Sequence, residues 1–229
     1  MTFIVGENGT GKSTLLEGLA VFCDLPVIGS ESPKRDPSFI PARRLASAMK
    51  PVWNIRTRRG LFFRAEDFFS FIRGVKKDMK ELDNNIEEYE RTLSGYGLQL
   101  ARGSMEGQKH ALTSKYGDEP EARSHGEAFL NIFQQRIVPG GLYIMDEPEV
   151  PLSPLRQLAL ISLIMEQQEQ SQFIIATHSP MIMAIPGASI LCIDSGDIVE
   201  KPWDEIGHVQ LYRQFMEAPE RFIRNLNIT

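Results

Sequence analysis

The feature that most constrains this chain is a glycine-rich segment near its start. Gly6-Glu7-Asn8-Gly9-Thr10-Gly11-Lys12-Ser13 matches the complete pattern G-x-x-x-x-G-K-[ST]. Such a loop turns successive backbone N–H groups inward around a phosphate, which requires backbone angles that glycine permits. The apolar residues 2–5 predict a short buried strand before the loop, and residues 12–22 predict a helix after it. A strand, this loop and a helix in that order predict a phosphate site, with a chance match in a structural loop as the alternative.

The loop assigns roles to individual side chains. Lys12 is expected to reach the β- and γ-phosphates of a nucleotide, and the Ser13 hydroxyl to hold Mg²⁺. The candidate nucleotide-binding residues are Gly6, Glu7, Asn8, Gly9, Thr10, Gly11, Lys12, Ser13 and Thr14.

Two carboxylates end a second apolar segment, at residues 142–147. Ligands of open α/β sheets bind at the carboxyl ends of strands, so this position favours a site. Asp146 suits the Mg²⁺ shell, through water, and Glu147 is the candidate general base for an attacking water. Taken alone, such a pair is usually a solvated turn.

A third candidate, His178, follows the apolar segment 173–177. At a strand end, its imidazole is placed to bond a γ-phosphate and sense its presence. We interpret His110 and His208 as surface or helix-packing residues.

The remaining pattern predicts an α/β layered fold with a mostly parallel sheet, because strands alternate with helices. Further helices are expected at 126–136, 154–168, 181–185 and 204–226, with a hairpin at 189–201. Residues 25–51 are expected to be irregular, and residues 95–107 to form a glycine-containing break. The whole chain, 1–229, is predicted to be one domain, with an inserted helical subdomain at 67–125.

The segment 68–93 is the most regular in the sequence. Its apolar residues recur at alternating spacings of three and four and predict an amphipathic helix; they are Ile72, Val75, Met79, Leu82, Ile86, Tyr89 and Leu93. Either it packs on its own helical neighbours, or it forms a coiled-coil arm that binds a partner.

Charge is unevenly distributed along the chain. The net charge is -5, yet residues 34–64 carry nine basic residues against one acid. This segment is a candidate DNA or RNA contact, or else a solvated loop whose arginines pair with the acidic remainder. No apolar run approaches the roughly 20 residues of a membrane span, so no membrane insertion is expected. Two separated cysteines exclude a disulfide framework or zinc cluster and favour a cytoplasmic setting.

Together these motifs resemble the ABC-type ATPases, in particular the stand-alone SMC-like group. Ser124-His125-Gly126-Glu127 resembles a degenerate signature motif, and residues 147–157 resemble the Walker B motif and D-loop. Residues 176–180 are similar to the switch region of that group. The resemblance implies a P-loop NTPase with ATP and Mg²⁺ as cofactors and a homodimer that forms on ATP binding. In that dimer Ser124, Gly126 and Glu127 would contact the nucleotide of the opposite subunit.

The sequence departs from that family in two places. The family has strands before the phosphate loop, with an aromatic residue that stacks on adenine, whereas here the loop begins at Gly6. Either the chain is a shortened version or adenine is held in another way. The glutamine expected between the loop and the helical insert is also absent, and Glu66 is the nearest substitute as a metal-side ligand.

Three hypotheses follow. The first is an Mg²⁺-dependent ATPase whose ATP-driven dimer acts on a protein or nucleic-acid partner. The second is the motor subunit of an ABC transporter, against which the signature lacks Leu-Ser-Gly-Gly-Gln. The third is a nucleotide-switched module that binds nucleic acid with little hydrolysis.

Overall fold

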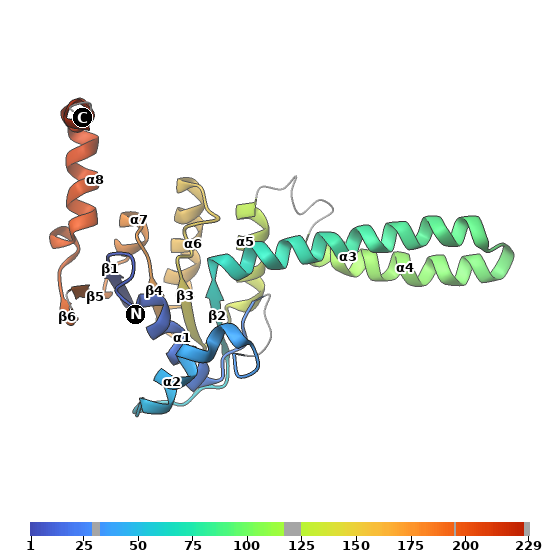
Figure 1. Cartoon of the computed structure of the whole chain (residues 1–229), viewed down its shortest axis with the longest axis horizontal. Coiled ribbons are helices and arrows are strands. Elements are labelled where there is room, and N and C mark those ends of the chain that lie inside the picture. The colour runs from blue at the N-terminus through green and yellow to red at the C-terminus, as the bar shows by residue number, and fades with distance from the viewer. Residues whose placement is uncertain (29–32, 117–124, 195, 227–229) are drawn as a thin grey trace.

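A six-stranded sheet organises the chain (Figure 1). This computed structural model describes residues 1–28, 33–116, 125–194 and 196–226. The strand order is β2-β3-β4-β1-β5-β6, parallel throughout except for the antiparallel pair β5–β6. The strands are β1 (Thr2–Gly6), β2 (Gly60–Arg64), β3 (Leu142–Asp146), β4 (Gln172–Ala176), β5 (Ser189–Asp194) and β6 (Asp197–Glu200). The predicted mostly parallel α/β fold is confirmed.

Helices cover both faces of this sheet. They are α1 (Lys12–Cys23), α2 (Ile40–Ala48), α3 (Ala65–Thr92), α4 (Gly95–Tyr116), α5 (His125–Arg136), α6 (Pro154–Gln167), α7 (Pro180–Met183), α8 (Gly207–Glu217) and α9 (Pro219–Leu226). Short 3-10 turns lie at Pro37–Phe39 and Trp203–Glu205.

The alternation of side chains along each strand divides the core in two. Ile4 and Ile144 face α1 and α2, in one buried cluster. Phe3 and Tyr143 face the opposite side, where α5, α6 and the first turns of α3 pack. The centre of that side is aromatic, because the ring of Phe63 in β2 contacts rings of α3 and α5: Phe68, Phe129 and Phe133. This packing fixes β2, α3 and α5 to one another.

The prediction that residues 25–51 are irregular is wrong in part. Proline at the first positions of a helix is favoured, because its fixed φ suits the helix and its missing N–H would have no partner there. A 3-10 turn begins at Pro37, and Pro41 stands in the first turn of α2. Ala42 and Ala46 then pack α2 against α1.

The predicted break at 95–107 is also wrong. These residues belong to α4, which runs back along α3, and the two helices project together away from the sheet (Figure 1). The four glycines of α4 lower its intrinsic propensity, but packing against the apolar stripe of α3 outweighs that cost. Lys109 pairs with Asp83, and Arg102 pairs with Glu90, across the two helices. We call α3 beyond its first turns, together with α4, the arm.

Beyond the β5–β6 hairpin, the described residues form two helices, α8 and α9. The tail is helical as predicted and is interrupted at Pro219, where α9 begins. Among the described residues no helix is long and apolar enough to cross a membrane.

Candidate functional site

The predicted site residues follow three neighbouring strands. β4 lies between β1 and β3, and all three are parallel, so their carboxyl ends meet at one edge of the sheet. The phosphate loop follows β1, Asp146 ends β3, and His178 comes two residues after β4. We call this edge the nucleotide edge. In an open α/β sheet it is where ligands bind.

The phosphate loop has the backbone that its sequence predicts. Gly9 and Gly11 have φ values of 84° and 90°, in the left-handed region that favours glycine. Gly11 is also the N-cap of α1, so no side chain caps the first N–H groups of that helix. Those groups face the loop and carry the positive end of the helix dipole. Lys12 is buried, and its Nζ donates to the carbonyls of Gly6, at 2.7 Å, and Glu7, at 2.9 Å.

Asp146 combines burial with an unsatisfied oxygen. Its Oδ1 has no hydrogen-bond partner, and the residue is 8% exposed. Burial raises the pKa of Asp146 to about 6, against a hydrogen bond from Ser13 that lowers it. A buried carboxylate beside a hydroxyl, with lone pairs left over, is the donor set that a hard divalent cation takes.

The donor set fits a metal that is shared with phosphates. Within the described ranges no cluster of three or more His, Cys, Asp or Glu side chains could hold a metal ion. Mg²⁺ is commonly held by one or two protein oxygens together with nucleotide phosphates and water. Ser13 and Asp146 match that smaller demand.

Glu147 has a strained backbone. Its φ is 52°, which is uncommon for a residue with a side chain, and such strain concentrates at functional sites. Its N–H donates to the carbonyl of Ala176 at 2.9 Å, which fixes the chain across β4. The Glu147 side chain is 41% exposed, and its Oε1 lies 3.9 Å from Nε2 of His178. The acid and the histidine therefore occupy one small region of the edge.

A second acid, Glu149, hydrogen-bonds the backbone of His178. The backbone N–H of His178 donates to Oε1 of Glu149 at 2.6 Å. Nε2 of His178 is buried without a hydrogen-bond partner. Burial, assisted by the nearby Lys12 and His208, lowers the pKa of His178, so the imidazole is neutral at pH 7. A neutral ring with an unpaired nitrogen can bond a phosphate that arrives beside it.

His208 does more than pack on the surface, so our interpretation of it is incomplete. The first turn of α8 brings its ring to 4.9 Å from the ring of His178, edge-on. Its Nε2 lies 3.8 Å from Oε1 of Glu7 in the phosphate loop. No sequence signal points to this, because the contact depends on α8 returning to the nucleotide edge.

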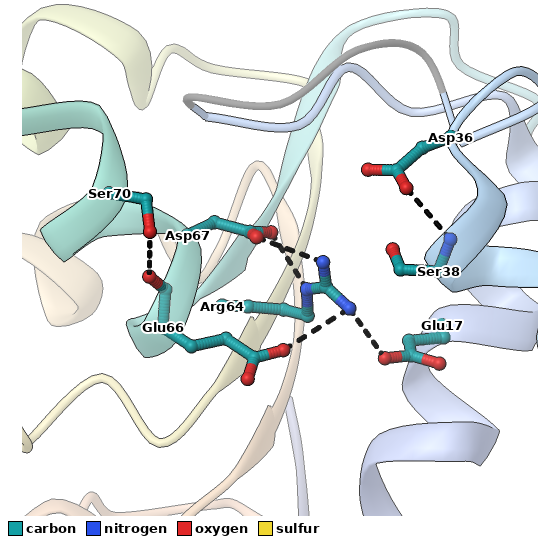
Figure 2. Close-up of polar contacts among 7 residues, drawn as sticks. All are labelled: Glu17, Asp36, Ser38, Arg64, Glu66, Asp67 and Ser70. Atoms are coloured by element: carbon teal, nitrogen blue, oxygen red, sulfur yellow. Dashed lines mark hydrogen bonds and ion pairs between the residues drawn. The ribbon is translucent and has the colours of Figure 1, made fainter. Parts of the chain in front are cut away.

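Beside this group lies a cluster of charges around Arg64, of which the sequence predicts a role for Glu66 alone (Figure 2). Arg64 ends β2 in register with Asp146 of β3 and contacts Glu17, Glu66 and Asp67. Glu66 stands in the first turn of α3, with its side chain 76% exposed and 3.3 Å from Nη1 of Arg64. The structure thus places Glu66 at the end of the strand next to Asp146.

The signature residues lie on a different helix, and Ser124 is outside the described residues. Gly126 is buried in the first turn of α5, where an added Cβ would lie 2.6 Å from Cδ of Arg156. Glu127 pairs with Arg156 of α6 at 2.7 Å. The beginning of α5 lies across α6 from β1, away from the phosphate loop of its own chain (Figure 1).

The basic segment 34–64 is divided by the fold. Arg64 is buried at the nucleotide edge, Arg43 bonds the carbonyls of Pro33 and Asp36, and Lys34 pairs with Asp24. The other six basic side chains are exposed, on and around α2 and the loop before β2: Arg35, Arg44, Lys50, Arg56, Arg58 and Arg59.

Comparison with known proteins adds a family match. Residues 128–184 match a protein family described as "AAA domain, putative AbiEii toxin, Type IV TA system". This range contains β3, α6 and β4, and therefore Asp146, Glu147 and His178.

Several solved structures are similar to this chain. One is the Smc head domain of Pyrococcus furiosus bound to the C-terminal domain of ScpA, at 14% identity and a TM-score of 0.42, covering 96% of this chain and 93% of that one. Another is a dimeric ATP-binding cassette protein bound to ADP and Pi, at 14% identity and 0.41, covering 90% and 86%. The SMC head domain from Thermotoga maritima matches at 13% and 0.36, covering 88% and 89%.

The phosphate loop, the parallel sheet and the acidic pair at the nucleotide edge define a P-loop nucleotide-binding fold. The matched family model covers residues 128–184 and therefore includes β3 and β4 of this fold, with Asp146 at the end of β3 and His178 two residues after β4.

Proposed function

We propose that this chain binds and hydrolyses ATP with Mg²⁺ and that two copies close around the nucleotide. The observation that carries the proposal is the unpaired, buried Oδ1 of Asp146 beside Ser13, next to a loop shaped for phosphate. A buried carboxylate oxygen without a hydrogen-bond partner costs stability, so this arrangement favours a ligand that supplies the missing interaction.

The chain's own residues divide the work of binding. The N–H groups of the loop and of the first turn of α1 bind phosphate oxygens, and Lys12 turns its ammonium from the carbonyls of Gly6 and Glu7 to the phosphates. Ser13 and Asp146 hold the metal. Mg²⁺, when bound, would neutralise charge that develops on the phosphates.

The reaction needs a water aimed at the last phosphorus. Glu147 accepts a hydrogen bond from that water and takes its proton; its Oε1 lies 3.9 Å from Nε2 of His178. Neutral His178 bonds the terminal phosphate and reports its presence through Glu149, which holds the backbone of His178. Phosphoryl transfer depends on this positioning more than on covalent chemistry.

The place of α5 supports a dimer. Gly126 and Glu127 begin a helix that lies away from the phosphate loop of its own chain, so a second copy is needed to bring a signature segment to the nucleotide (Figure 1). Glu127 would act there through Arg156, which fixes its carboxylate.

Replacing the general base separates binding from turnover. We expect Glu147→Gln to retain ATP binding but to lower hydrolysis at least about 100-fold, because an amide cannot take the proton. The trapped ATP should then hold the mutant as a dimer. Light scattering coupled to size-exclusion chromatography, with Mg²⁺ and ATP, measures this.

The matched control is Glu169→Gln, which removes an exposed acid from the turn before β4. It should hydrolyse ATP like the wild type and should not accumulate dimers. Normal hydrolysis by Glu147→Gln would remove Glu147 from the role of base.

Nucleic-acid binding by the segment 34–64 is a second candidate, favoured by its six exposed basic side chains. Phosphate contacts of this kind weaken steeply with salt. DNA affinity that stays constant between 50 and about 200 mM salt would exclude it.

A further inference from the structure

Arg64 joins two helices that the motifs treat separately. Its side chain is 7% exposed and lies between α1 and the first turn of α3 (Figure 2). Nε and Nη2 bond the two oxygens of Asp67 at 2.7 and 2.9 Å, and Nη1 bonds Oε1 of Glu17 at 2.8 Å. The guanidinium also lies 4.5 Å from the ring centroid of Phe39.

This geometry requires an arginine. The planar guanidinium carries five donors in a fixed fork, so the paired bonds to Asp67 fix its plane and leave Nη1 directed at Glu17. Lysine has the charge but cannot hold two acids in one plane. Because Arg64 is buried, losing Glu17 or Asp67 would remove one of the two acids that hydrogen-bond its charge.

The two acids belong to different parts of the molecule. Asp67 is in the first turn of α3, the 28-residue helix that continues into the arm. Glu17 is one turn after Ser13 on α1, the helix that opens at the phosphate loop, and its charge acts on Asp146. The Glu17–Arg64 pair therefore spans from the helix of the nucleotide edge to the base of the arm.

Glu66 adds an exchangeable partner. It lies 3.3 Å from the same Nη1 that bonds Glu17, and its side chain is 76% exposed, against 14% for Glu17. Glu66 can leave Arg64 for the nucleotide edge without unpairing the guanidinium, because Glu17 and Asp67 remain.

We propose that the Glu17–Arg64 pair is a positioning link that transmits occupancy of the nucleotide edge to the base of α3 and so to the arm. The inference rests on the proposed nucleotide binding. Phosphates bound at the amino end of α1 would fix the first turns of that helix, and with them the side chain of Glu17. Glu17 holds Arg64 through its hydrogen bond. Arg64 in turn holds the start of α3 through its paired hydrogen bonds to Asp67. Since a helix of this length extends about 40 Å, a small rotation at its base moves the far end by several ångströms.

Hydrogen exchange of the full chain tests the link. The probe is Mg²⁺ with ATPγS, and the amides followed are residues 65–72, whose first members have no helical partner and exchange readily. In the wild type we expect nucleotide to slow exchange there at least about threefold. Glu17→Gln should bind nucleotide within about threefold of the wild type, by calorimetry, and lose at least half of that response.

The matched control is Glu87→Gln. It removes a carboxylate from the same helix, but its partner Arg91 lies at 3.4 Å on the exposed surface of the arm. It should keep the full response. Arg64→Lys should behave like Glu17→Gln, because the charge without the fork does not rescue the link.

A full response in Glu17→Gln, or bound nucleotide without any response in the wild type, would overturn the link. Absence of nucleotide binding in the wild type overturns the proposed function itself, and calorimetry reads that separately. If Glu17→Gln does not fold, Asp67→Asn takes its place, since it loosens the α3 side while Glu17 stays paired. An unchanged response in Asp67→Asn would equally overturn the link.

Discussion

The nucleotide edge and the arm differ in whether their polar groups are buried and whether they are paired. At the edge, polar side-chain atoms are buried and some are unpaired: Oδ1 of Asp146 and Nε2 of His178 have no hydrogen-bond partner. In the arm, charges lie in water and pair with neighbours, as Arg91 does with Glu87 and Arg102 with Glu106. Buried unpaired groups cost free energy that a ligand can recover, whereas exposed pairs contribute little. We therefore infer that the nucleotide edge is suited to bind a ligand, whereas the arm is stable without one.

The largest effect is expected at the phosphate loop. Lys12→Ala removes the ammonium that faces the phosphates, so ATP hydrolysis should fall about 1000-fold, or about 4 kcal/mol of transition-state stabilisation. Steady-state phosphate release measures it. Lys109→Ala in α4 is the matched arm variant and should leave hydrolysis unchanged. If both variants lost hydrolysis equally, the nucleotide edge and the arm would not differ in their contribution to catalysis.

A smaller effect concerns the stability of the protein without ligand. The pKa of Asp146 is raised by burial from 3.8 to about 6, so the carboxyl favours the fold only when protonated. Its contribution is present below about pH 4 and is lost as pH rises through about 6. Asp146→Asn should therefore stabilise the ligand-free protein at pH 8 by up to about 3 kcal/mol.

Denaturant unfolding at several pH values checks this. The difference in free energy of unfolding between Asp146→Asn and the wild type should shrink as pH falls from 8 toward 4, over the range in which both proteins are folded. Mg²⁺ and ATPγS should stabilise the wild type and not the variant. If Asp146→Asn were less stable than the wild type at pH 8, burial of the charged carboxylate would not be costing the protein stability.

The smallest effect is expected in the arm. Glu87→Ala breaks an exposed pair spaced four residues apart, which should cost less than about 0.5 kcal/mol. Thermal unfolding at low and high salt gives the value. A loss above 1 kcal/mol would mean that the arm, like the edge, depends on specific charges.

Local patterns predicted much of this fold. The strands at residues 2–5, 142–145 and 173–177, the helix at 154–168 and the hairpin at 189–201 are confirmed within one or two residues. Each is set by neighbouring residues: an apolar run, a proline at a helix start, or a glycine in a turn.

The failures share a physical cause. α4 forms in spite of its glycines because α3 provides an apolar surface, and no local pattern contains that partner. β2 has the apolar residues of a buried strand, but its place beside β3 comes from sheet pairing, which then sets Arg64 opposite Asp146. His208 reaches His178 only because α8 returns to the nucleotide edge.

By itself, the sequence determined the phosphate loop, the strands and helices that carry the predicted site, and the identity of the acids, because each depends on residues close together in the chain. The tertiary structure alone decided which charges are buried and paired, since burial depends on segments far apart in sequence. Glu17 and Arg64 are 47 residues apart, and only packing α1 against the end of β2 brings their charges into contact. The raised pKa of Asp146 likewise comes from its burial by the surrounding fold.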